Sequence, residues 1–197
     1  REQIYLNARV TLNQDGRWNL YNEQTIGSLV FNGGRIELGS SAPYGNLYLN
    51  GDVTVNATAG NTAYITGGQP GTGLSLTRAQ TGGTGVSNSV RTFTVGDSSG
   101  VTDDLRIEAR IFNGGIIKEG AGTMTVTNTN TYELTTTVNN GILNVQNNSG
   151  LGAGGSDSDA TTVNTGGQLQ LDNTANGNLV IASEKLNLLG TGFGWVA

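Results

Sequence analysis

Hydrophobic and polar residues alternate along most of this chain. The clearest run is residues 105–111, in which apolar and charged side chains take turns: Leu105, Arg106, Ile107, Glu108, Ala109, Arg110 and Ile111. Successive side chains of a β-strand point to opposite faces, so this spacing predicts a half-buried strand. We expect Leu105, Ile107 and Ile111 to point inward and the three charged side chains to point outward.

The same period of two recurs in shorter runs, and no stretch has the spacing of a helix. These runs are Leu47 and Leu49, Val53 and Val55, Leu74 and Leu76, Met124 and Val126, Leu169 and Leu171, and Leu186 and Leu188. Asn-Gly pairs lie between them and favour tight corners, because both residues readily take positive φ. The pairs are Asn32-Gly33, Asn50-Gly51, Asn113-Gly114, Asn140-Gly141 and Asn176-Gly177. The chain is therefore predicted to be all-β.

An internal repeat indicates how these strands are arranged. Residues 136–145 resemble residues 161–171, and the matching valines, Val138 and Val163, are 25 positions apart. A strand-and-turn repeat of this length is typical of a β-solenoid. Asn-Gly pairs also occur in two-residue hairpins, so an antiparallel sandwich is the alternative fold. The very short strands and the many corner glycines favour the solenoid.

The segment 114–171 begins Gly-Gly-Ile-Ile-Lys-Glu-Gly-Ala-Gly-Thr and continues with an Asn-Thr-Tyr element, a Thr-Thr-Val strand and Gly-x-Leu-x-Val. This pattern resembles the autotransporter-associated β-strand repeat. The matching positions are Gly114, Gly115, Lys118, Gly120, Gly122, Thr123, Thr125, Asn130, Thr131, Tyr132, Thr136, Thr137, Val138, Gly141, Leu143 and Val145. At Glu133-Leu134 the family often has a glycine-bearing turn, so the corner after Tyr132 is expected to differ.

This resemblance implies a right-handed parallel β-helix that is exported to the bacterial outer surface or to the extracellular space. Such repeats form the stalk of passenger proteins and carry no activity of their own. At 25 residues a turn, residues 1–197 would make one domain of roughly eight coils, about 40 Å long. The expected function is therefore that of a structural stalk or fibre subunit.

The amino-acid composition argues against several other functions, namely histidine- or cysteine-based catalysis, nucleic-acid binding and membrane insertion. The chain has 32 glycines, no histidine, no cysteine and a net charge of −5. Without histidine or cysteine, a Ser-His-Asp triad, a Cys-His pair and a histidine metal site are excluded. No basic stripe is present to neutralise phosphates, so nucleic acid is not an expected partner. No apolar run is long enough for a membrane helix, so we expect no membrane insertion in this segment.

Two aspartate pairs are the remaining candidates for chemistry, namely Asp103 with Asp104 and Asp157 with Asp159. Some β-helix enzymes cleave polysaccharides with paired carboxylates, and aspartates also bind Ca²⁺. Both pairs lie in Gly/Ser-rich segments that are predicted to be projecting loops, where solvated carboxylates are common. The repeating Gly-Gly-x-Gly-x-Asp calcium motif is not present. We therefore expect weak calcium binding at most, no cofactor and no enzyme activity.

The two ends of the sequence suggest self-association. Both are apolar and strand-like, and a β-helix leaves an unpaired strand edge at each end. We expect head-to-tail stacking into a filament, a contact that does not close on itself. The alternative is that the chain is an interior piece of a longer array, so that neighbouring repeats of the longer chain cover the two ends. The residues expected at the joint are Tyr5, Leu6, Val10, Leu186, Leu188, Phe193 and Trp195. An adhesin that binds surface polysaccharide or a host protein through residues 78–104 is the alternative, and a polysaccharide-active enzyme is a third class.

Overall fold

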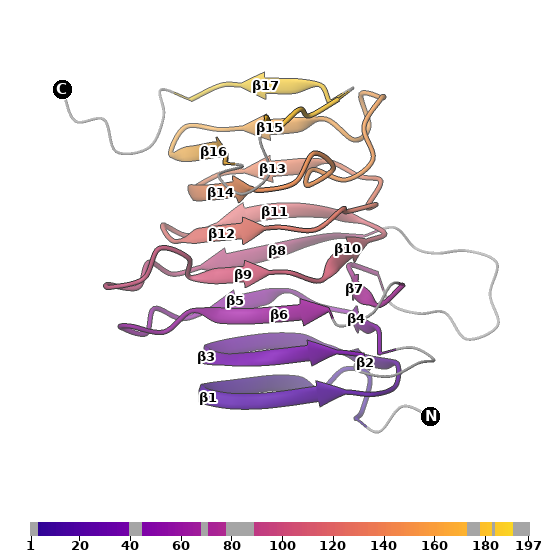
Figure 1. Ribbon diagram of the computed structural model, residues 1–197, viewed down its shortest axis with the longest axis vertical. Coiled ribbons are helices and arrows are strands. Elements are labelled where there is room, and N and C mark those ends of the chain that lie inside the picture. Colours follow the sequence, from indigo (N-terminus) through magenta and orange to yellow (C-terminus); the bar gives the residue numbers. More distant parts are fainter. Residues whose placement is uncertain are drawn as a thin grey trace.

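The computed structural model of the protein describes residues 4–39, 45–67, 71–77, 89–172, 178–182 and 184–190. These residues form 17 β-strands and no helix, as the alternation predicts (Figure 1). Every strand pair in the described part is parallel, and one large sheet of 13 strands curls as a half barrel. The antiparallel alternative is therefore wrong. The corner at Asn176-Gly177 lies outside the described residues.

The large sheet contains two stacks of strands that meet along a bend. We call them the first and second stacks. The strands β1 (Arg9–Leu20) and β3 (Ser28–Leu38) run through the bend, so each contributes its first half to the first stack and its second half to the second. The pairing of β3 makes this plain, because Leu29–Phe31 pair with β5 whereas Arg35–Leu38 pair with β6.

The other strands of the two stacks are short. The first stack continues with β5 (Val53–Val55), β8 (Val90–Val95), β11 (Gly115–Glu119), β13 (Thr136–Val138), β15 (Thr161–Val163) and β17 (Leu186–Leu188). The second stack continues with β6 (Ala63–Gly67), β9 (Leu105–Ile107), β12 (Thr123–Val126), β14 (Gly141–Val145) and β16 (Gly167–Leu171). In Figure 1 both stacks rise in chain order, from indigo β1 to the orange and yellow strands.

A third stack is separate from the large sheet. It is a four-stranded parallel sheet made of β2 (Gln24–Ile26), β4 (Leu47–Leu49), β7 (Gly73–Ser75) and β10 (Arg110–Phe112). In the described part of the chain, the pairing continues beyond β10 as a single bridge between Phe112 and Thr131.

The register of the strands reproduces the repeat seen in the sequence. Val138 pairs with Val163, so the 25-residue spacing is the distance along the chain between neighbouring strands of the first stack. Asn140-Gly141 forms the corner between β13 and β14 rather than a hairpin. Gly141 has a φ of 65°, and a Cβ there would collide with the carbonyl oxygen of Gly120. This corner therefore requires glycine.

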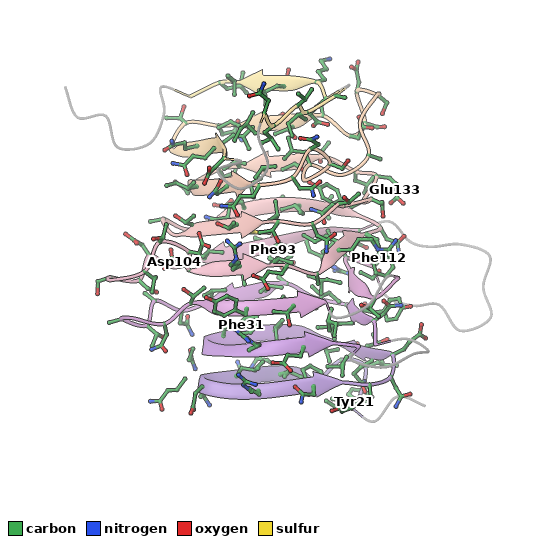
Figure 2. All side chains as sticks on the ribbon, viewed as in Figure 1. Tyr21, Phe31, Phe93, Asp104, Phe112 and Glu133 are labelled. Atoms are coloured by element: carbon green, nitrogen blue, oxygen red, sulfur yellow. The ribbon has the colours of Figure 1, made fainter. Side chains whose placement is uncertain are left out.

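The core is a set of parallel ladders of inward-pointing side chains. Phe31 and Val55 are one such pair, and Phe93 lies opposite Val53 (Figure 2). Leu105, Ile107 and Ile111 are fully buried. Their charged neighbours Arg106, Glu108 and Arg110 are partly exposed, so the predicted inward and outward directions are confirmed. The prediction of one strand is wrong, because β9 ends at Ile107 in the large sheet and a separate strand begins at Arg110 in another sheet.

Amide side chains form a second kind of ladder on the outside. Asn56 donates to Asn32, and Asn32 donates to Asn13, each over 2.7 Å. Asn164 likewise donates to Asn139, which donates to Glu119, each over 2.6 Å. These bonds join the same corner on neighbouring levels and reinforce the backbone pairing, as stacked amides do in other parallel sheets.

Candidate functional site

The lower face of the molecule is the free edge of β1. Within the described residues this strand pairs only with β3. Its inward side chains continue the core ladders by one level, because Val10 lies opposite Leu29 and Trp18 lies opposite Ile36. The core therefore reaches this face with no described strand below it.

An open hollow of about 460 Å³ lies at this face. Its walls are Ile4, Val10, Thr11, Leu12, Asn13, Gly16, Arg17 and Trp18. Trp18 and Val10 are half-buried and pack against the core, as expected for a tryptophan that covers the end of the stack. The hollow is thus largely apolar at its base and polar at its rim.

The segment before β1 contains the predicted joint residues Tyr5 and Leu6. Gln24 fastens this segment, since its side chain accepts from the Ile4 amide over 3.1 Å and donates to the Ile4 carbonyl over 3.0 Å. Leu6 is half-buried, whereas the side chain of Tyr5 is 73% exposed. Tyr5 is therefore a large aromatic group presented to solvent next to the hollow.

The opposite face carries two of the other predicted joint residues, Leu186 and Leu188. Leu186 and Leu188 pair with Thr161 and Val163, whose side chains point into the core, so both leucines occupy inward positions. They are nevertheless 44% and 65% exposed. Phe193 and Trp195 lie outside the described residues. On both end faces, therefore, apolar side chains occupy inward positions but are still partly exposed to solvent.

The structure corrects the interpretation of Asp103 and Asp104 as solvated loop-tip carboxylates. Asp104 is only 3% exposed, and its carboxylate accepts from the amides of Ser98 over 2.6 Å and Thr123 over 2.7 Å. Asp103 accepts from Arg106 over 2.9 Å and from the Thr125 hydroxyl over 2.6 Å. Both carboxylates are occupied in holding the loop between β8 and β9 against the strands.

The two members of the second aspartate pair differ in exposure. Asp159 is 7% exposed and accepts from the Ser156 amide over 3.0 Å, so its predicted solvated position is wrong. Asp157 is exposed as predicted and forms an ion pair with Lys185 over 2.8 Å, which lowers the pKa of the Asp157 carboxyl. No group of three or more acidic side chains that could hold a metal ion exists among the described residues.

A buried lysine is the feature that the sequence interpretation missed. Lys118 is fully buried and lies in the core ladder between Phe93 and Val138. Its ammonium donates to the carbonyl oxygens of Glu119 over 3.0 Å, Gly120 over 2.8 Å and Asn140 over 3.1 Å.

Two opposing effects act on the charge of Lys118. Burial removes water from the ammonium and lowers its pKa from 10.5 to about 8, while the nearby Asp104 and Glu119 carboxylates act in the opposite direction. The side chain thus stays mostly charged at neutral pH. The signal that could have revealed this site is simple, because Lys118 follows Ile116 by two residues and so shares its inner face.

Comparison of the chain with protein-family models, with curated proteins and with solved structures finds no match in any of the three. The described residues include no helix long and apolar enough to cross a membrane. The geometry of the end faces and of the buried polar groups is therefore the basis on which a function can be argued.

Proposed function

We propose that this protein is a structural β-solenoid, a stalk or fibre segment that stacks end to end. Its architecture would be a right-handed parallel β-helix of about eight coils, as the resemblance of residues 114–171 to the autotransporter-associated repeat implies. The eight parallel strands of the first stack, counted in the described part of the chain, support that coil number. The same resemblance supports a place outside the bacterial cell.

The observation that carries this proposal is the apolar character of both end faces. Parallel pairing would let a further strand continue each stack, because an edge strand offers unpaired backbone groups. On a second copy placed below the first, with the register of the first stack continued, Leu188 would come to lie under Val10 and Leu186 under Ala8. This contact would repeat the spacing of the strands already present, and the repetition would produce an open filament.

A charge placed on the end face formed by β17 tests the stacking. We expect the purified chain to form rods that lengthen with concentration in sedimentation velocity and negative-stain electron microscopy. Leu188→Glu should leave single units, because it buries a carboxylate in the joint. Its matched control is Asn187→Glu, which adds the same charge to the same strand but points outward, and which should still stack.

A deletion tests the other end face. Removal of residues 1–8 should leave short soluble rods, as Leu188→Glu does.

Two results would count against end-to-end assembly. One is a wild-type chain that remains monomeric in light scattering at high concentration. The other is equal behaviour of Leu188→Glu and wild type. Because Leu188 is 65% exposed, its replacement should cost little stability, and a folded monomeric variant can be verified by circular dichroism.

We expect no glycosidase or lyase activity. The carboxylates of Asp103 and Asp104 accept hydrogen bonds from the loop and strands of the chain itself, and Asp104 is buried, so this pair is not presented to a polymer on the surface. An assay of the purified chain on pectin and alginate, followed by absorbance of unsaturated products and by reducing ends, measures this. Turnover that is lost in Asp103→Asn would contradict the expectation.

An adhesin remains the second candidate, and the described part of residues 78–104 gives it one specific support. The loops 56–62, between β5 and β6, and 96–104, between β8 and β9, project together from the side on which the two stacks are connected (Figure 1). They are joined by bonds from the Gly60 amide to the Ser99 carbonyl over 2.9 Å and from the Thr58 amide to the Ser98 hydroxyl over 3.0 Å. Such a paired ridge could contact a partner, and residues 78–88 lie outside the described residues.

A further inference from the structure

Three backbone carbonyl groups converge on one point inside the molecule. They belong to Glu119 and Gly120, at the corner between β11 and β12, and to Asn140, at the corner between β13 and β14. The two corners lie on neighbouring levels, because β11 pairs with β13. The Lys118 ammonium occupies the point of convergence, at 2.8–3.1 Å from all three oxygens.

Charged groups lie on both sides of this point. On the inner side lies the ammonium, and on the outer side lies the Glu119 carboxylate, which accepts from the side-chain amides of Asn139 over 2.6 Å and Asn140 over 3.2 Å. The buried Asp104 carboxylate also acts on the ammonium. Among the described residues neither carboxylate forms an ion pair with Lys118. The direct partners of the ammonium are therefore carbonyl dipoles.

We propose that these three carbonyls form a cradle for a monovalent cation of ammonium size, and that Lys118 supplies this cation from the chain itself. Its three donors match three acceptors, which is the full bonding capacity of an ammonium group. Rings of backbone carbonyls also replace the hydration shell of K⁺ in selective pores. The cradle is thus a cation site that the ammonium of Lys118 fills. Through its bonds to the three carbonyls, this ammonium joins the corner after β11 to the corner after β13.

A variant without the Lys118 ammonium tests which free cations the three carbonyls bind. Lys118→Met keeps an unbranched side chain in the core ladder but leaves the carbonyls without a donor. Melting temperatures are compared in KCl, NH₄Cl and LiCl at equal ionic strength. We expect the variant to melt several degrees below wild type in LiCl and to recover a measurable part of the loss in KCl and NH₄Cl. Wild type should be indifferent to the choice of cation.

The chain offers a matched control in its second lysine. Lys185 is exposed and bound to Asp157, so Lys185→Met should melt close to wild type and respond equally to all three salts. A melting temperature of Lys118→Met that does not depend on the cation would overturn the cradle. A dependence of equal size in wild type would do so as well.

A measurement on the unaltered protein decides the question if Lys118→Met does not fold. Reductive methylation of the folded chain at pH 8, followed by peptide mass spectrometry, should modify Lys185 and spare Lys118. Both lysines should react after unfolding in urea. If Lys118 in the folded chain reacts as fast as Lys185, the ammonium is not enclosed by the carbonyls and the proposal is wrong.

Discussion

Replacement of Ile107 by Asp is expected to prevent the central strands from folding. Ile107 is completely buried and pairs with Ile65 on one side and Val126 on the other. An isolated carboxylate at this position would have no partner in the apolar ladder, and burial of an unpaired charge costs many kcal/mol. That cost is comparable to the whole stability of a typical domain, about 5–15 kcal/mol. Loss of the β-sheet signal in far-UV circular dichroism would measure it.

The matched control is Glu108→Ala on the neighbouring position. Glu108 points outward, and its carboxylate accepts from Arg106 over 2.9 Å with 41% of the side chain exposed. Exposed ion pairs of this kind contribute about 0.2–1 kcal/mol, so this variant should fold and unfold almost as wild type does. Equal damage from the two substitutions in urea unfolding would contradict the inward and outward assignment.

Asp104→Ala is expected to destabilise the protein by about 2–5 kcal/mol, because it leaves the buried amide of Ser98 and the partly buried amide of Thr123 without their acceptor. The effect should spread through the loop, since Ser98 in turn accepts from the Thr58 amide on the loop of the level below. Urea denaturation measures the loss. Limited proteolysis should show earlier cleavage within residues 96–104.

Asp97→Ala tests whether this loss is specific. Asp97 is an exposed aspartate in the same loop, so its removal changes the net charge equally but breaks no buried hydrogen bond. We expect a change within about 0.5 kcal/mol, as for most surface substitutions. If both alanine variants lose the same stability, the carboxylate of Asp104 does not hold the loop in the way described here.

Together these substitutions distinguish two sources of order in the protein. The apolar ladders exclude water between the stacks, whereas buried carboxylates and the buried ammonium satisfy backbone groups at the loops and corners. In a molecule whose levels contact mainly their neighbours, damage at one level is expected to remain partly local. Hydrogen exchange measured residue by residue would show whether the sheet opens in segments or as one unit.

The sequence alone was sufficient to predict the strands and their spacing. The inward and outward directions at residues 105–111 follow from the period of two of extended chain, so they could be predicted without knowledge of the neighbours. The division of this segment between β9 and β10, in two different sheets, could not. The 25-residue offset between Val138 and Val163 is likewise a property of the chain, and it appears directly in the register. The spacing of Leu186 and Leu188 also placed both side chains correctly on one face of the strand. The experiment with Leu188→Glu tests whether a second copy of the chain covers them.

Only the tertiary structure decided the roles of Asp104, Asp159 and Lys118. A polar side chain is acceptable inside a protein if it finds partners there, and for Asp104 and Lys118 one of those partners lies far away in the sequence. Asp104 accepts from Thr123, 19 residues later, and Lys118 donates to Asn140, 22 residues later. Gly/Ser-rich surroundings predicted a loop correctly but could not reveal that the carboxylate turns inward. Its direction depends on the amides that the next level presents, and these come into place only when the strands are stacked.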